Sequence, residues 1–179
     1  IPETEPWTHI HPPGPSPVAL DKASGLLKES VRPLILVGSG IHNALAHDAL
    51  RVFAEEFQIP VGTSFSGKGA LSEAHPLSLG VLDPSGTGHG FRAARECDLL
   101  IGVGVRFHDF NTLAWNMYPI PESARLVHID VDPIELSRNY PSEVAMVADG
   151  RLGLEGLADA ARRERVAPDK HKPWLDELE

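Results

Sequence analysis

Residues 126–133 read LVHIDVDP, a short apolar run that ends in two carboxylates one residue apart and is closed by a proline. A continuous apolar run is typical of a strand that is buried on both faces of a parallel sheet. Ligands of such sheets bind beyond the carboxyl ends of the strands, which is where Asp130 and Asp132 would lie. A carboxylate there can accept hydrogen bonds from ribose hydroxyls, whereas an aspartate before a proline is typical of a helix N-cap. We therefore expect Asp130 to face a ligand and Asp132 to serve mainly the local turn.

A second apolar run, Leu34–Val37, is followed by a glycine turn made of Gly38, Ser39 and Gly40. This turn begins like the dinucleotide-binding fingerprint, in which a tight turn brings a pyrophosphate close to the next helix. Asn43 stands where that fingerprint has its third glycine, so a plain strand-to-helix turn is an equal alternative. The next strand ends in Gly-Thr instead of an acidic residue, which argues against a nicotinamide-dehydrogenase site.

The clearest predicted strand lies in the stretch Leu99–Phe107. Glycines and Arg106 stand near the carboxyl end of this stretch. A glycine at the end of a strand, here Gly104, lets a ligand approach the backbone closely. The guanidinium of Arg106 could pair with a phosphate or stack on a flat ring. The alternative is that Arg106 is held by a nearby carboxylate such as Asp109.

Two further residues are candidates for the same pocket. Lys68 lies between two glycines, where it could reach a phosphate or could be an ordinary solvated lysine of a loop. Asp149 precedes Gly150, where it could lie at the rim of the pocket or cap the last helix. The predicted cofactor-binding residues are therefore Gly38, Ser39, Gly40, Lys68, Gly104, Arg106, Asp130 and Asp149.

Strands and helices alternate along the chain. Helical periodicity is expected over residues 18–30, 43–57 and 152–161. A further helix is expected to follow Gly88 and to run to about Cys97. Apolar strands are expected at 34–37, 59–63, 99–105, 125–131 and 143–147, with a minor strand or none in 64–90. Such alternation implies right-handed crossovers. The fold class is therefore α/β: a doubly wound, Rossmann-like, mostly parallel six-stranded sheet with helices on both faces.

Length and charge limit the classes of function. A chain of 179 residues is one ordinary domain, and the six prolines among residues 1–17 predict an extended linker. We expect the domain to cover 18–165 and a charged tail, 166–179, to lead to a missing C-terminal domain. The net charge of −9 argues against a nucleic-acid partner, and no apolar stretch is long enough for a membrane span. The single cysteine allows no intrachain disulfide and favours a cytoplasmic location.

No catalytic group is evident in the sequence. The nine histidines lack metal-ligand spacing, so no metal site is predicted. Cys97 lies beside Asp98 on the apolar side of a helix, where burial and a neighbouring carboxylate raise a thiol pKa and disfavour a nucleophile. His128, within an apolar strand, is expected to be a hydrogen-bonded core residue.

The chain from about Val18 onward resembles the central domain of thiamine-diphosphate-dependent enzymes of the acetolactate synthase type, because several short motifs occur in the same order and spacing. They are Gly67-Lys68-Gly69, His75–Gly80, Cys97–Phe107, His128–Pro133 and Val147-Ala148-Asp149. The resemblance implies a domain of the DHS-like NAD/FAD-binding fold. In this family that domain holds FAD in acetolactate synthase, an ADP moiety in some relatives, and nothing in others.

The resemblance also implies what the parent enzyme contains. An N-terminal domain would carry the glutamate that activates the thiazolium ring, and a C-terminal domain would bind Mg²⁺ and the diphosphate. The parent would be a homo-oligomeric 2-oxo-acid carboligase or decarboxylase, and the fragment itself would be inactive. Two departures argue against FAD in particular: Ser85-Gly86 replaces a histidine-glycine pair, and His108-Asp109-Phe110 replaces an aspartate pair and an arginine. The alternatives are a self-standing nucleotide- or flavin-binding module and a purely structural domain with an empty pocket.

Overall fold

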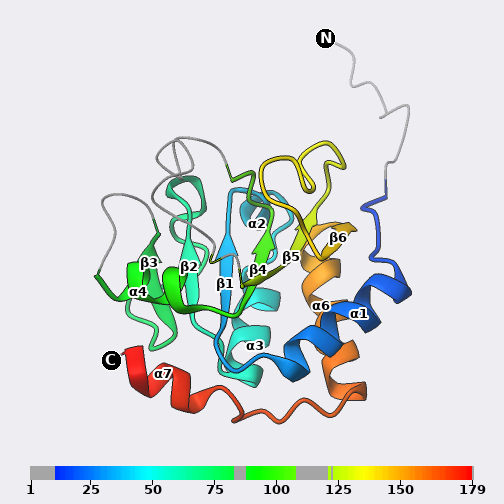
Figure 1. The fold of residues 1–179 in the computed structure, drawn as a ribbon. Helices are drawn as coiled ribbons and strands as arrows, with labels where there is room; N and C mark the ends of the chain where they lie inside the picture. Colours follow the sequence, from blue (N-terminus) through cyan, green and yellow to red (C-terminus); the bar gives the residue numbers. More distant parts are fainter. Residues whose placement is uncertain (1–10, 83–87, 108–120, 122, 179) are drawn as a thin grey trace.

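The computed structural model describes residues 11–82, 88–107, 121 and 123–178, whose ribbon is shown in Figure 1. They form one six-stranded sheet in the order β3-β2-β1-β4-β5-β6, and every pair of neighbouring strands is parallel. The strands are β1 (Pro33–Val37), β2 (Val61–Thr63), β3 (Ser78–Val81), β4 (Leu99–Val103), β5 (Arg125–Asp130) and β6 (Val144–Val147). The predicted α/β fold with a six-stranded parallel sheet is confirmed.

Helices cover both faces of this sheet. They are α1 (Pro17–Glu29), α2 (Gly40–Asn43), α3 (His47–Phe57), α4 (Gly88–Glu96), α6 (Gly150–Arg163) and α7 (Lys172–Leu178), with a short 3-10 turn η1 (Phe65–Gly67). Strand order reverses between β1 and β4, because the chain builds outward to β3 on one side and to β6 on the other. Such a reversal separates the loops above the two central strands and leaves room for a ligand there.

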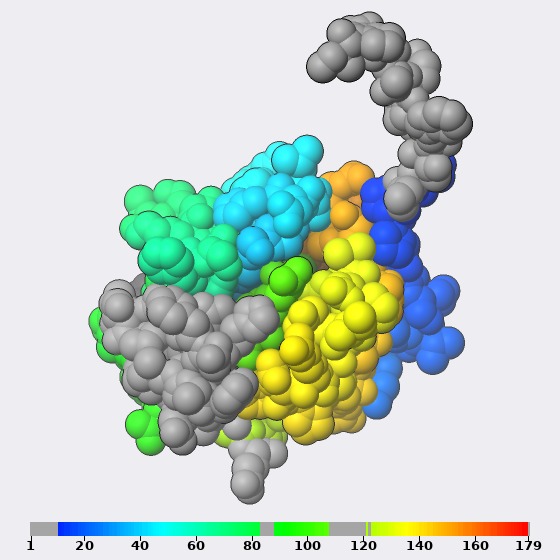
Figure 2. All heavy atoms as spheres, turned by 90° about the horizontal axis from the view of Figure 1, so that it is seen from above, coloured from blue at the N-terminus to red at the C-terminus, as the bar shows by residue number. Residues whose placement is uncertain are grey.

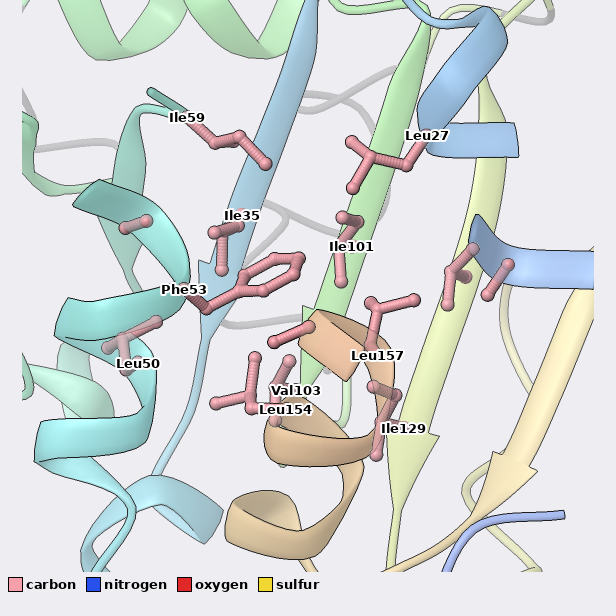
Figure 3. Close-up of a cluster of buried hydrophobic side chains, with 14 of the residues drawn as sticks. Leu27, Ile35, Leu50, Phe53, Ile59, Ile101, Val103, Ile129, Leu154 and Leu157 are labelled. Carbon is pink, nitrogen blue, oxygen red and sulfur yellow. The ribbon is translucent and has the colours of Figure 1, made fainter. Parts of the chain in front are cut away.

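Alternate strand residues feed two separate cores, as the period of two along a strand requires. One core joins β1, β4 and β5 to the helices α1, α3 and α6. Figure 3 shows this core, including Leu27, Ile35, Phe53, Ile101, Ile129 and Leu157. The opposite core joins the alternate residues Leu34, Leu100 and Leu126 to α4 and α7. Both faces are thus buried, which explains why the strands read as continuous apolar runs.

The structure settles three local points, of which the first is a correction. The helix predicted over residues 43–57 is two helices, α2 and α3, because Leu45 between them has a left-handed φ of 51°. The minor strand in 64–90 exists as the edge strand β3. No helix follows Asp132 among the described residues: its Oδ1 accepts a hydrogen bond from the Ile134 N–H (3.0 Å), which caps a turn instead.

The segment after residue 165 packs on the domain, which its charged composition did not reveal. Trp174 is 2% exposed, and its Nε1–H donates to the carbonyl of Pro33 (3.2 Å). The guanidinium of Arg32 lies 5.1 Å from the centre of the Trp174 ring. His171 is fully buried and donates from Nδ1 to the carbonyl of Phe57 (2.7 Å). Residues up to Leu178 therefore belong to the packed body, and whether they lead on to a further domain stays a prediction.

Replacing Trp174 by alanine should lower the free energy of unfolding by about 3–5 kcal/mol, because a large buried ring is lost and a cavity remains. Urea denaturation followed by circular dichroism measures this change. The matched control is Lys172→Ala on the exposed side of the same helix, which should change stability by no more than about 0.5 kcal/mol. An unchanged urea midpoint for Trp174→Ala would show that α7 does not contribute to the fold.

Candidate functional site

A crevice of about 310 Å³ lies beyond the carboxyl ends of β1, β4, β5 and β6, at the point where strand order reverses. Figure 2 looks down on this end of the sheet and shows a hollow between the α2 region, the end of β4 and the start of α6. The lining residues are His11, Pro12, Pro13, Gly40, Asn43, Ala44, Gly104, Ile129, Asp130, Val131, Ala148, Asp149 and Gly150. This is the position at which open α/β sheets bind their ligands.

The turn between β1 and α2 lies so close to the backbone at the end of β4 that it has room only for glycine at positions 38 and 40. A Cβ atom on Gly40 would lie 2.5 Å from the Cα of Gly104, and one on Gly38 would lie 2.2 Å from the carbonyl oxygen of Gly104. Gly104 itself has a left-handed φ of 57°, which suits a residue without a side chain. The turn and the end of β4 thus pack directly on each other, and Gly40 and Gly104 form one wall of the crevice.

Asp130 and Asp149 combine local structural roles with places in the crevice wall. The Oδ1 atom of Asp130 accepts from the Asp132 N–H (2.9 Å), and the residue is 7% exposed. The Oδ1 atom of Asp149 accepts from the N–H groups of Arg151 (3.0 Å) and Leu152 (3.2 Å) and so caps α6. Both interpretations that the sequence left open for Asp149 are therefore compatible with its position.

The two predicted cationic residues lie apart from the crevice. Lys68 is exposed and pairs with Glu73 (2.5 Å). Arg106 lies with its Nε atom 4.0 Å from Oε1 of the buried Glu135. The suggested partner Asp109 lies outside the described residues. Neither Lys68 nor Arg106 lines the crevice, so the structure brings together only four of the eight predicted residues: Gly40, Gly104, Asp130 and Asp149. Gly38 and Ser39 stand in the turn itself, outside the lining.

The N-terminal arm supplies a wall that the sequence analysis did not foresee. The Asp149 N–H donates to the carbonyl of Pro13 (2.9 Å). Pro15 covers Gly156 of α6, where a Cβ atom would lie only 3.0 Å from its Cγ. The proline content predicted an extended segment, but nothing in the sequence indicated that residues 11–15 lie along the domain.

The buried titratable groups nearby have structural roles. Burial, and secondarily Asp98, raises the pKa of the Cys97 thiol to about 12, which disfavours the thiolate. His128 is buried, donates from Nε2 to the carbonyl of Val105 (2.8 Å), and meets the edge of Phe107. Burial lowers the His128 pKa, and the hydrogen bond to Val105 opposes that shift. The prediction that His128 is a hydrogen-bonded core residue is confirmed. Across the described ranges, no three metal-ligating side chains gather at one place.

Comparison with known proteins identifies the class to which this fold and crevice belong. The profile of the family described as "Thiamine pyrophosphate enzyme, central domain" matches residues 20–157, and the chain belongs to that family. The acetolactate synthase large subunit of Parasynechococcus marenigrum is 38% identical over 93% of this chain and 27% of its own length. The chloroplastic acetolactate synthase 1 of Oryza sativa subsp. japonica is 37% identical over 94% of this chain and 26% of its own length.

A solved structure agrees with these sequence relatives. Benzoylformate decarboxylase from Polynucleobacter necessarius superimposes with a TM-score of 0.70 at 26% identity, over 89% of this chain and 30% of the other. The chain thus spans about a quarter of the length of the curated relatives it matches. The predicted family is confirmed, and a self-standing flavin- or nucleotide-binding module is not favoured. No helix in the described part of the chain is long and apolar enough to cross a membrane. A cytoplasmic location and a homo-oligomeric parent stay predictions.

Replacing Gly104 by alanine should cost far more stability than replacing Gly69, although both glycines have a positive φ. At Gly69 the new methyl group meets open space, so only backbone strain of about 1–2 kcal/mol applies. At Gly104 the clash with Gly40 adds about 1–3 kcal/mol of overpacking. Thermal and urea unfolding of the two variants measure the difference, and equal losses would contradict the close backbone approach.

Stability should fall as the pH is lowered from 8 to 5.5. The pKa values of His128 and His171 are lowered in the folded protein, mainly by burial, so the unfolded chain binds more protons in this range. Their stabilising contribution is present above the unfolded histidine pKa and is lost as the pH falls, by at most about 1.4 kcal/mol per pH unit for each group. Urea titrations at several pH values measure this slope. The variant His128→Gln should have a shallower slope, and an unchanged slope would refute the assignment of His128.

Proposed function

We propose that this chain is the middle, non-catalytic domain of a thiamine-diphosphate-dependent enzyme that joins or cleaves 2-oxo acids, in the manner of acetolactate synthase. The observation that carries the proposal is the family match over residues 20–157 combined with a coverage of only about a quarter of the relatives' length. Thiamine diphosphate, when bound to the parent, supplies the carbanion-stabilising chemistry of such reactions. The domain would contribute a rigid scaffold between an N-terminal and a C-terminal domain of the same chain.

The described residues do not fit thiamine diphosphate and Mg²⁺. Magnesium takes carboxylate and phosphate oxygens in an octahedral arrangement. Asp130 and Asp149 are the acidic side chains that line the crevice, and each already accepts backbone hydrogen bonds. No third ligand side chain joins them within the described parts. We infer that other domains of the parent hold the metal and the diphosphate, and we assign no catalytic step to this domain.

A nucleotide-type ligand fits the position of the crevice and half of its predicted residues. Gly40, Gly104, Asp130 and Asp149 come from four different segments and meet at the strand reversal. The segments that carry the two departures from the FAD-binding pattern, around Ser85 and His108, lie outside the described residues. We therefore propose a nucleotide-type pocket, in which Asp130 is the residue best placed to accept ligand hydroxyl groups.

The isolated chain should not release carbon dioxide from pyruvate when thiamine diphosphate and Mg²⁺ are added, because no described group can activate the cofactor. The measurement is a coupled assay of the folded 179-residue chain, with an acetolactate synthase large subunit as the positive control. Turnover above the buffer rate would refute a non-catalytic role. The flanking coding sequence provides the second test: a glutamate-bearing domain upstream and a magnesium motif downstream are expected, and the absence of both would overturn the assignment of the parent.

A further inference from the structure

Two histidines outside the candidate site face each other at the corner between α2 and α3. His42 belongs to α2, and His47 is the first residue of α3. The Nδ1 atom of His42 lies 2.9 Å from the Nε2 atom of His47, and the centres of the two rings are 5.1 Å apart. Both residues are half-buried, so solvent reaches the pair.

The contact between the two rings requires that at least one imidazole is neutral. A hydrogen bond between two ring nitrogens needs one N–H group and one lone pair, whereas two protonated imidazoles would bring two N–H groups together. A neutral imidazole can present either of its nitrogens to a metal ion, because its hydrogen can sit on the other one. When a metal ion enters a neutral pair, the hydrogen between the rings therefore moves to the second nitrogen of its own ring, and no proton is lost.

The distance between the two nitrogens favours particular metals. Two bonds of about 2.0–2.1 Å from imidazole nitrogens to one metal ion span 2.9 Å when the angle at the metal is about 90°. That angle joins neighbouring ligands in the square-planar and tetragonal complexes of Cu²⁺ and Ni²⁺. Tetrahedral Zn²⁺ needs the nitrogens about 3.3 Å apart, so the rings would have to separate. For any of these metals, each ring turns so that its lone pair points to the ion instead of to the other ring.

The backbone between the histidines is already fixed, which lowers the cost of holding both rings on one ion. Leu45 lies at the bend with a left-handed φ of 51°, and its N–H donates to the carbonyl of His42 (3.1 Å). The Ala46 N–H donates to the carbonyl of Ile41 (2.9 Å), and both of these residues are fully buried. A metal ion therefore has to order two side chains and not a loop.

The two histidines would be the protein ligands, and water would complete the coordination shell. Within the described part of the chain, no group of three metal-ligating side chains occurs. Asp48 follows His47, but its side chain is 95% exposed and its Oδ1 atom lies 3.5 Å from the guanidinium of Arg51. Magnesium prefers oxygen ligands, so a pair of imidazoles does not suit it.

We propose that His42 and His47 form a surface site for a divalent transition-metal ion, which takes Cu²⁺ and Ni²⁺ in preference to Zn²⁺ and does not take Mg²⁺. The inference does not depend on the function proposed for the parent enzyme. The bound ion joins α2 to α3 across the bend. Asn43 and Ala44 lie between the two ligands and line the crevice, so the ion also holds that part of the crevice wall.

The first test is a calorimetric titration of the untagged 179-residue chain with NiCl₂, ZnCl₂ and MgCl₂. Ni²⁺ should bind more tightly than Zn²⁺, and Mg²⁺ should give no heat of binding. His42→Gln and His47→Gln should each weaken Ni²⁺ binding at least tenfold, because loss of a ligand costs no less than the 10–100-fold typical of an outer-shell partner. His75→Gln is the matched control: it changes a half-buried histidine elsewhere, and it should leave the affinity unchanged.

The second test separates this site from the histidines of the proline-rich arm, His9 and His11, which could bind metal on their own. A metal raises the unfolding temperature only if it binds the folded protein more tightly than the unfolded chain. NiCl₂ should therefore raise the thermal midpoint of the unmodified chain and of the double variant His9→Ala/His11→Ala by several degrees. It should leave the midpoint of His42→Gln unchanged. Comparing each variant with and without NiCl₂ removes any effect of the substitution on stability itself.

Four results would overturn the inference: no Ni²⁺ binding up to millimolar concentration, unchanged Ni²⁺ affinity in His42→Gln or His47→Gln, tighter binding of Zn²⁺ than of Ni²⁺, or loss of the thermal shift in His9→Ala/His11→Ala. None of them bears on the turnover assay or on the flanking coding sequence.

Discussion

The close approach of the β1–α2 turn to the end of β4 is the constraint on which the crevice depends. Gly38 and Gly40 press on Gly104 with no side chain between them, and the backbone hydrogen bonds from Gly38 and Gly40 join the two segments. These contacts lie at the reversal of strand order, where the segments that follow β1 and β4 lead away in opposite directions. Because the joint is made of backbone, it fixes one wall of the crevice without using any polar side chain.

The sheet could be predicted because its central strands are buried on both faces, and burial of that kind leaves a continuous apolar run. The parts that could not be predicted lie at the edges of the sheet and at the ends of the chain. β3 is a short edge strand of half-buried residues, so its sequence carries little periodic signal. The segment 166–178 is rich in charged residues, and its docking depends on a few residues such as His171 and Trp174, which donate to the carbonyls of Phe57 and Pro33 more than a hundred residues earlier in the sequence.

The site could be predicted only in part, for a different reason. The ends of strands can be recognised in a sequence, so the sequence predicts that Asp130 and Gly104 lie together beyond the carboxyl ends of their strands, as the structure shows. The direction of a long side chain is not visible, and Arg106 points toward Glu135, which lies almost thirty residues further along the chain. The glycine turn was ambiguous because glycine is required both where a phosphate approaches a backbone and where a second backbone does. The distances to Gly104 show that the second requirement is present here.

The shape of the crevice is set by three segments that meet there. The crevice is where the arm, the glycine turn and the start of α6 meet, and Asp149 contacts two of these three segments: its N–H binds Pro13 and its carboxylate caps α6. The arm continues directly into α1, which packs on α6 in the same core. Any molecule seated between Pro13 and Asp130 therefore touches the segment through which the chain enters the domain. Among the described residues, the hydrogen bond from the Asp149 N–H to Pro13 and the packing of Pro15 over Gly156 are the contacts that hold this segment against α6, whereas each sheet strand is held by a ladder of backbone pairing.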